Sequence, residues 1–308
     1  MCMKRSTRGV LCALSGGILW GVSGTVGQYL FTHRELSSQW LTTVRMILAG
    51  IILLLLAAAK SPDSLKQIWK VRGDALRMIL FAVFGLMTCQ YTYMTAISHS
   101  NSATATALQY LGQALILIVT CVRLRRLPSG REGIALLLAL GGVFLLATHG
   151  RLDNLALSAQ ALFWGIGAAV SLMLYTLLPG GIIERYGSVA VTGYGMLIGG
   201  IVLGIATGAY KQFVRLDWTI LLGVGSIVIL GTAAAFTLYL QGVSDIGGVR
   251  ASLFACAEPV SAALATTLWL KTEFSVADWL AFGLIFLMAV LLVLPSRKAE
   301  AKKSAPVR

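Results

Sequence analysis

The sequence is short of charged residues, of histidine and of paired cysteines. Only 12% of its 308 residues are charged, against roughly 25% in a typical globular chain. The five cysteines form no CxxC pair and no cluster with the three histidines, so neither a metal site nor a disulfide framework is indicated. These shortages exclude a cytosolic enzyme, a disordered chain and a disulfide scaffold, and no cofactor is expected.

What fills the chain instead is apolar. Hydrophobic residues make up 57% of it, and the mean hydropathy is +0.82. A helix crosses a bilayer core about 30 Å thick with about 20 apolar residues. Ten segments approach or meet this length: 9–31, 37–59, 78–97, 102–122, 133–148, 158–178, 188–209, 218–241, 251–270 and 276–294. The sequence therefore predicts an all-α membrane protein with ten transmembrane helices and no separate extramembrane domain.

Basic residues outnumber acidic ones by 25 to 12, and this excess would suggest nucleic-acid binding in a soluble protein. When the N-terminus is placed inside, the loops and tails on that side hold 19 Lys and Arg, and the outer loops hold five. Because these residues are enriched in cytoplasmic loops, both termini are predicted to lie in the cytoplasm. We expect a multi-pass plasma-membrane protein, in a bacterial inner membrane, with no nucleic-acid partner. The basic cytoplasmic tail at 295–308 is interpreted as a topology determinant that contacts anionic lipid.

The two halves of the chain resemble each other. The motif at 19–21 (Leu-Trp-Gly) recurs at 163–165 (Phe-Trp-Gly), an offset of 144, and 96–98 (Ala-Ile-Ser) recurs at 242–244 (Gly-Val-Ser), an offset of 146. Five spans per half is an odd number, so the second copy must be inverted relative to the first. We predict two inverted five-helix repeats, at 9–148 and 158–294. Inverted repeats around a central site are typical of alternating-access transporters.

Several short motifs, taken in order, resemble the EamA-type permeases of the drug/metabolite transporter superfamily, in the bacterial ten-helix group that moves carboxylates, amino acids and amines. They are 19–21, Arg45, 104–111, 163–165, 257–260 and Glu273 with 278–280. The resemblance covers nearly the whole chain and implies a secondary transporter of a small organic metabolite, usually an exporter of amino acids, amines or related compounds. Such permeases usually carry a proline where this chain has Gln113, so a helix break is expected only in the ninth span, at Pro259.

Glu258 is the most informative single position. It is the eighth residue of the predicted ninth span, roughly 11 Å from the inner end of the helix. A carboxylate at that depth is costly unless it is protonated, paired or in contact with an aqueous cavity. Glu258 is therefore the candidate for proton coupling and for binding a cationic substrate group. The alternative is a helix-packing or gating role that does not depend on substrate.

Other polar and aromatic residues gather in the helices that the repeat places at the centre. The offset of 146 pairs Gly112 with Glu258 and Gln113 with Pro259, so the amides should face the carboxylate, and the paired Trp20 and Trp164 should wall the same cavity. Arg45 either extends to the interface or contacts an anion in the cavity. The predicted substrate-binding residues are Glu258, Gln109, Gln113, Tyr93, Tyr239, Trp20, Trp164, Gln90, Tyr91 and Arg45. The alternative for each amide or phenol is a hydrogen bond to a neighbouring helix.

Three other functions stay open at this stage. An exchanger of phosphorylated or carboxylated metabolites would use Arg45, but a phosphate site usually needs two or more cationic groups. An intramembrane serine protease would use Ser23 in Gly-Val-Ser-Gly at 21–24, yet all three histidines fall at span ends or in loops. A non-transporting scaffold has little loop surface for a partner. We therefore expect a transporter and not an enzyme, with a small-molecule substrate, the lipid bilayer as its surroundings and a homodimer as an open alternative.

Overall fold

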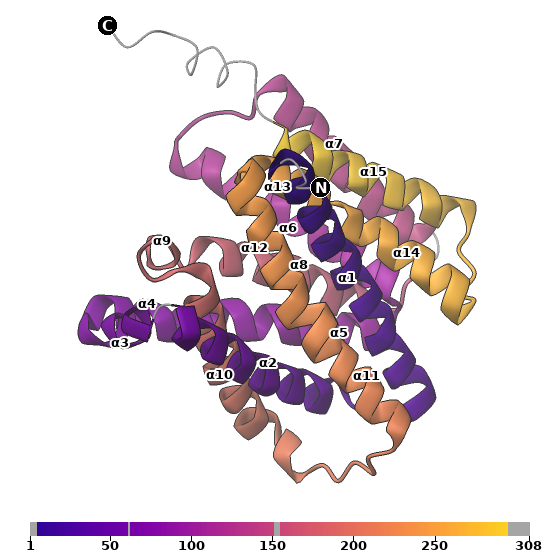
Figure 1. Ribbon diagram of the computed structural model, residues 1–308. Coiled ribbons are helices and arrows are strands. Elements are labelled where there is room, and N and C mark those ends of the chain that lie inside the picture. Colours follow the sequence, from indigo (N-terminus) through magenta and orange to yellow (C-terminus); the bar gives the residue numbers. More distant parts are fainter. Residues whose placement is uncertain (1–4, 61, 151–154, 295–308) are drawn as a thin grey trace, which may run out of the picture.

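The computed structural model describes residues 5–60, 62–150 and 155–294, and within these ranges the regular elements are all helices (Figure 1). Ten segments are long and apolar enough to cross a membrane, which confirms the predicted all-α fold. Seven spans are single helices: α1 (Arg5–Arg34), α2 (Ser38–Lys60), α6 (Ser102–Arg123), α7 (Gly130–Thr148), α8 (Ala159–Leu177), α10 (Ser188–Thr207) and α15 (Val276–Val293). We call the side of the molecule where α1 begins the proximal side, and the side where α1 ends the distal side.

The third, eighth and ninth spans are composite. The third is α4 (Arg72–Leu80), the π-helical η1 (Phe81–Met87) and α5 (Thr88–His99); the eighth is α11 (Trp218–Val228), the π-helical η3 (Ile229–Ala234) and α12 (Ala235–Ile246); the ninth is α13 (Gly248–Ala255) and α14 (Ala257–Leu270). Three short elements join spans: α3 (Pro62–Lys70), α9 (Ile182–Tyr186) and the 3-10 turn η2 (Ala209–Lys211).

Polar caps set where several spans begin. The side chain of Asn101 accepts a hydrogen bond from the N–H of Thr104 at the start of α6. Ser129 and Glu132 form a reciprocal capping box at the start of α7, and for this reason the fifth span begins at residue 130 rather than at the predicted 133. The third span also begins before its predicted start at 78, because the charged residues in α4 lower its hydropathy without preventing a helix.

The ninth span is interrupted as the sequence predicts, and the fourth span is continuous. Pro259 has no N–H, and its ring clashes with the carbonyl four residues earlier in a regular helix. That carbonyl belongs to Ala255, which is the last residue of α13. The freed carbonyl oxygen of Ala255 faces the hydroxyl of Tyr110 at 3.4 Å. One proline therefore divides the span and leaves a backbone acceptor for a neighbouring helix to satisfy.

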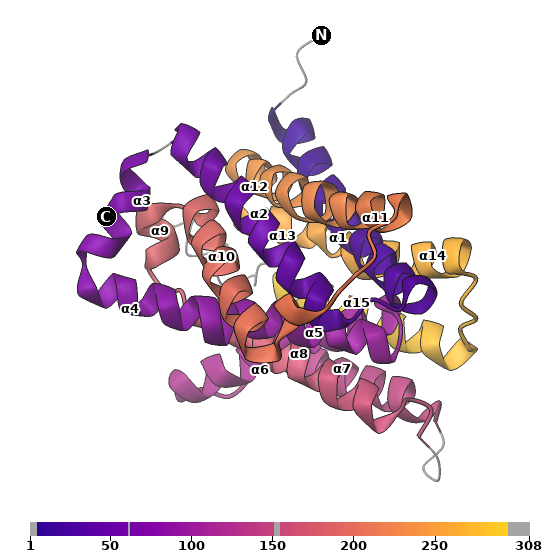
Figure 2. The ribbon, with the colours of Figure 1, turned by 90° about the horizontal axis from the view of Figure 1, so that it is seen from below.

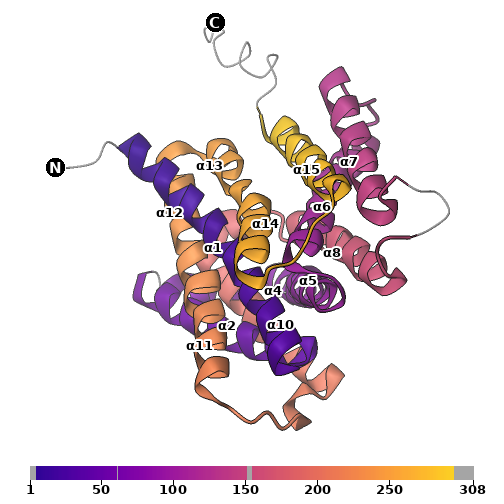
Figure 3. The same cartoon turned by 90° about the vertical axis from the view of Figure 1, so that its right-hand side faces the viewer.

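The contacts between spans follow an inverted two-fold pattern. Helix α1 packs along α12 and α14, and its counterpart α8 packs along α5 and α6, so exchanging the two halves reproduces the same contacts. Helix α2 also packs against its counterpart α10 (Figure 2), and α7 packs against its counterpart α15 (Figure 3). Gly21 and Gly165, from the repeated Trp-Gly motif, occupy equivalent contacts: a side chain at Gly21 would overlap Ser261 and the backbone of Glu258, and one at Gly165 would overlap Leu108.

Two hydrophobic cores lie on either side of the molecular centre. The α2–α10 core includes Leu53, Phe81 and Met196, with the adjoining ends of the first, third and eighth spans. The α7–α15 core includes Leu146 and Ile285, and it joins the fourth, fifth, ninth and tenth spans. The space between the two cores is where a solute-binding site is to be sought.

The predicted basic tail at 295–308 lies outside the described residues.

Candidate functional site

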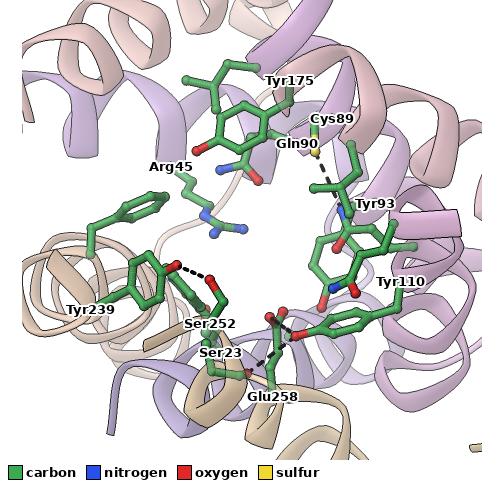
Figure 4. Close-up of a pocket in the computed structure, with 18 residues that line it drawn as sticks. Ser23, Arg45, Cys89, Gln90, Tyr93, Tyr110, Tyr175, Tyr239, Ser252 and Glu258 are labelled. Carbon is green, nitrogen blue, oxygen red and sulfur yellow. Dashed lines mark hydrogen bonds between the residues drawn. The ribbon is translucent and has the colours of Figure 1, made fainter. Parts of the chain in front are cut away.

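A cavity of about 360 Å³ lies between the two cores (Figure 4). This volume is in the range of small-molecule sites. Seven spans contribute to it, namely the first four and the sixth, eighth and ninth. The lining residues are Trp20, Ser23, Gly24, Arg45, Leu86, Cys89, Gln90, Tyr93, Gln109, Tyr110, Gln113, Leu172, Tyr175, Phe236, Tyr239, Ser252, Ala255 and Glu258.

Glu258 enters the cavity from the first turn of α14. The break before Pro259 places this carboxylate at a helix N-terminus inside the membrane, where the helix dipole favours negative charge. The hydroxyl of Tyr110 lies 3.2 Å from Oε2 of Glu258 and 3.4 Å from the carbonyl oxygen of Ala255, so it can donate to either acceptor. Among the residues that the structure describes, no basic side chain forms an ion pair with Glu258. The carboxyl group of Glu258 therefore lines the cavity without a basic partner among the described residues.

Arg45 lies on a different wall of the same cavity, and Figure 4 shows it pointing inward from α2. Its exposed fraction is only 5%, so the alternative that it extends to the interface is wrong. Its Nε donates to Oγ1 of Thr232 at 3.2 Å, and this contact holds the side chain inside. The buried Nη1 of Arg45 has no hydrogen-bond partner within the described part of the chain. A buried guanidinium N–H without an acceptor is costly, which makes it a ready donor for a ligand.

Aromatic rings and amides surround these two charges. Trp20 packs against Phe236 and Tyr239 at centroid distances of 5.2 and 5.3 Å, and Tyr239 is hydrogen-bonded to Ser252 at 3.0 Å. The buried Oε1 of Gln113 has no partner in the described residues. Apolar walls with a few convergent polar groups are typical of sites that bind small amphipathic molecules.

The structure brings eight of the ten predicted site residues to the cavity, all except Trp164 and Tyr91. Those two pack edge-to-face against each other at 5.5 Å, in the distal part of the sixth and third spans. Trp164 is the repeat counterpart of Trp20, but its ring partner Tyr91 corresponds to Thr237 at the offset of 146, not to Phe236 or Tyr239. Because the cavity extends from the membrane centre toward the proximal side, only one member of the tryptophan pair lines it.

The sequence prediction missed several lining residues. Phe236 is the repeat counterpart of Gln90 at the offset of 146, so the repeat alone was sufficient to indicate it. Tyr175 and Ser252 carried no such signal. Ser23 lines the cavity, and none of the described lining residues is a histidine, so the triad that a serine protease requires is not assembled there.

The distal side of the cavity is closed by a layer of hydrogen bonds that we call the distal seal. Oε1 of Gln28 accepts the backbone N–H of Ser102 at 2.8 Å. The other three contacts join hydroxyl groups: Ser38 with Thr95 at 3.1 Å, Thr25 with Thr266 at 3.3 Å, and Tyr93 with Thr106 at 2.8 Å. These eight residues are all buried, and the bonds link the first four spans and the ninth.

The proximal side carries two ionic clusters instead. Asp245 of α12 binds Arg8 of α1 at 2.7 Å and approaches Arg5 at 3.4 Å. In the second cluster Asp74 of α4 accepts hydrogen bonds from Arg185 at 2.7 Å and from the hydroxyl of Tyr186 at 2.8 Å. Each of these contacts joins elements on the proximal side of the cavity: α1 with α12 in the first cluster, and α4 with α9 in the second.

Comparison with known proteins finds similarity to membrane transporters in both halves of the chain. The EamA-like transporter family matches residues 7–148 and again residues 159–294. The uncharacterized inner membrane transporter YicL of Salmonella typhimurium is 38% identical over 296 residues, which cover 96% of this chain and 98% of that one. The uncharacterized transporter YwfM of Bacillus subtilis is 23% identical over 306 residues, 96% of this chain and 97% of that one.

A solved crystal structure with 18% sequence identity superposes with a TM-score of 0.64 and covers 97% of this chain and 99% of its own. At that identity the likeness concerns the fold alone. The family match in both halves and the relative at 38% identity establish more than the fold. The chain belongs to the EamA-like transporter family, and it is a multi-pass membrane transporter.

Proposed function

We propose that this transporter carries a small zwitterionic metabolite, an amino acid or a related amine, by alternating access and that it works as an exporter. The observation that supports this proposal is the pair of unpaired opposite charges in one cavity. Glu258 offers a carboxylate for an ammonium group, and Nη1 of Arg45 offers a donor for a carboxylate. An amino acid supplies both groups, and its side chain would contact the rings of Trp20, Phe236 and Tyr239.

Alternating access is supported by the inverted repeat and by the distal seal. The cavity lies on the proximal side of the distal seal, which supports a state open to the proximal side. Exchange of the two halves would produce the opposite state, with Trp164 in the position that Trp20 holds now. The excess of basic residues in the proximal loops and tails supports a cytoplasmic location for that side, and the solute would be loaded from there.

Proton coupling would follow from the position of Glu258. The carboxyl group either holds a proton or, as a carboxylate, binds the ammonium group of the solute. A solute leaving on the distal side would then be replaced by a proton from that side, so solute and proton would move in opposite directions. Tyr110 would donate to the ionised carboxylate and to the Ala255 carbonyl when Glu258 is protonated.

Purified protein in liposomes tests the proposal with three probes that share the isobutyl group of leucine: leucine itself, 3-methylbutylamine, which lacks the carboxylate, and 4-methylpentanoate, which lacks the ammonium group. We expect the zwitterion to be transported best, with a rate that responds to an imposed pH difference. Glu258→Gln should remove that response, whereas Glu273→Gln, in the exposed loop before α15, should retain it. Unchanged pH dependence in Glu258→Gln would refute the coupling role.

The free Nη1 of Arg45 also supports a second candidate, an obligatory exchanger of anionic metabolites. Only one cationic side chain lines the cavity among the described residues, which favours the first candidate. The exchanger predicts that 4-methylpentanoate is transported better than leucine, that transport requires counter-substrate inside the vesicle, and that Arg45→Ala abolishes it. Net uptake of leucine into empty vesicles would exclude it.

A further inference from the structure

Two spans of the described chain contain a π-helical segment, and the repeat places both at the same position. The segments are η1 in the third span and η3 in the eighth. With the offset of 146, residues 81–87 map onto 227–233, which overlap η3, and Gly85 of η1 maps onto Gly231 of η3. A π-helical turn accommodates one extra residue within an α-helix. Such turns are rare in proteins overall, and those that occur are often located at functional sites. Their occurrence at equivalent places in both halves indicates a role in the transport cycle.

Each π segment separates a part of the span that is attached to the α2–α10 core from a part that forms the cavity wall. Helix α4 and η1 pack against α10, while α11 and η3 pack against α2. Apart from Leu86 of η1, the cavity residues of these two spans lie in the helices that follow: Cys89, Gln90 and Tyr93 in α5, and Phe236 and Tyr239 in α12. A change within η1 or η3 would therefore move the wall of the cavity relative to the α2–α10 core.

Thr232 links η3 to the binding site. Its hydroxyl donates to the carbonyl of Ile227 at 2.9 Å, five residues earlier, which is the spacing of a π turn. In contrast, Thr88, just after η1, donates to carbonyls four and three residues earlier, as in an α-helix. The Thr232 hydroxyl also accepts the hydrogen bond from Nε of Arg45. The same group thus supports the wide turn and holds the guanidinium that faces the cavity.

We propose that η1 and η3 are the paired points at which the third and eighth spans change helical register during transport, and that Thr232 is a positioning residue that keeps η3 wide and Arg45 in the cavity. This inference rests on alternating access in the proposed function. Displacing the extra residue along the helix rotates the residues it passes by about 100° and shifts them by about 1.5 Å. Such a change in η3 would withdraw the acceptor of Arg45 and reorient Phe236 beside Trp20, so it would couple release of the solute to closure of the proximal side.

A pair of substitutions at Thr232 separates positioning from packing. Thr232→Val keeps the shape of the side chain and removes the hydroxyl, whereas Thr232→Ser keeps the hydroxyl and removes a methyl group. We expect Thr232→Val to lower the turnover of leucine in liposomes by about tenfold and Thr232→Ser to transport within about twofold of the unmodified protein. Equal losses in the two variants, or normal turnover in Thr232→Val, would overturn the role of the hydroxyl.

Deletion of one residue tests the π segment itself. Leu230 is half exposed on the outer surface of η3, and its deletion would convert the segment to a regular α-helix without changing the register on either side. Deletion of Leu287, similarly exposed in the α-helical α15, is the matched control, because every residue after it would turn by about 100°. We expect the Leu230 deletion to melt near the unmodified protein and to bind leucine without turnover, and the Leu287 deletion to melt much lower.

Normal turnover after deletion of Leu230 would overturn the proposal, and so would a loss of stability equal to that of the Leu287 deletion. If the unmodified protein neither binds nor transports any of the three probes, it is the proposed function that fails. Hydrogen–deuterium exchange then tests the π-helical segment η3 independently of transport. The amides of 229–234 should exchange faster than those of 218–228, and this difference should vanish in the Leu230 deletion. An unchanged exchange pattern in the deletion variant would contradict the inference.

Discussion

The two sides of the cavity are held together by different chemistry. On the distal side, neutral hydrogen bonds of the distal seal join spans to one another across the proposed path of the solute. On the proximal side, the carboxylates of Asp245 and Asp74 bind arginines in two separate ionic clusters. Hydrogen bonds between membrane helices contribute about 0.6 kcal/mol each on average, so the distal seal amounts to about 2 kcal/mol. In the proposed cycle, differential binding of a solute would be sufficient to open the distal seal, whereas each ionic cluster joins neighbouring elements on the proximal side.

The largest effect is expected from a covalent bond across the distal seal. Ser38→Cys with Thr95→Cys, in a chain whose native cysteines are replaced, would place two thiols where hydroxyls now lie 3.1 Å apart. Oxidation should abolish transport, and a reductant should restore it, because the distal side could no longer open. The matched control is Asp74→Cys with Arg185→Cys, which joins residues within one proximal cluster. Transport that persists in the oxidised distal pair would show that the solute does not leave by that side.

A smaller effect is expected when the distal seal is weakened rather than locked. Gln28→Leu removes the acceptor of the Ser102 N–H at the start of α6. A lost hydrogen bond of about 0.6 kcal/mol would shift the population of distal-open molecules by about threefold. Cys89 in the cavity, kept as the single cysteine, reports the shift through labelling by an impermeant maleimide added from the distal side. A labelling rate equal to that of the unmodified chain would argue against Gln28 as part of the seal.

Breaking a proximal cluster should affect stability more than transport. Asp245→Asn leaves Arg8 without its carboxylate partner, and the contact between α1 and α12 should weaken. We expect a melting temperature a few degrees lower, with transport retained within about threefold, because neither Arg8 nor Asp245 lines the cavity. Complete loss of transport at an unchanged melting temperature would show instead that the cluster takes part in gating.

The smallest effect concerns alkaline pH. Tyr186 lies outside the spans, and its hydrogen bond to the carboxylate of Asp74 raises the pKa of its phenol. A phenol whose pKa is higher in the folded than in the unfolded chain stabilises the folded protein. This stabilisation is fully present below the unfolded pKa of about 10, and it is lost as the pH rises through the folded pKa. Tyr186→Phe should therefore show a shallower fall in melting temperature above that pH. A fall as steep as in the unmodified chain would contradict this account.

The spans and the inverted repeat were within reach of sequence reasoning because both depend on composition and on short motifs. The ten apolar segments, the break associated with Pro259 and the position of Glu258 all follow from local chemistry. The orientation of Arg45 did not, because it depends on Thr232, which lies 187 residues away in the sequence. Trp164 was placed in the cavity because repeats are equivalent in sequence, whereas a single conformational state opens only one of the two equivalent sites. The π-helical segments could not be predicted from the sequence, because the apolar stretch 81–87 is equally compatible with an ordinary α-helix.

The close contacts at Gly21 and Gly165 set how near the two halves can approach each other. Each glycine brings its helix against the backbone or a leucine side chain of a span in the other half. Small residues at a helix crossing let the backbones approach closely, and this packing holds membrane helices together. The two glycines are therefore matched points of contact between the halves, at which any larger side chain would force the helices apart.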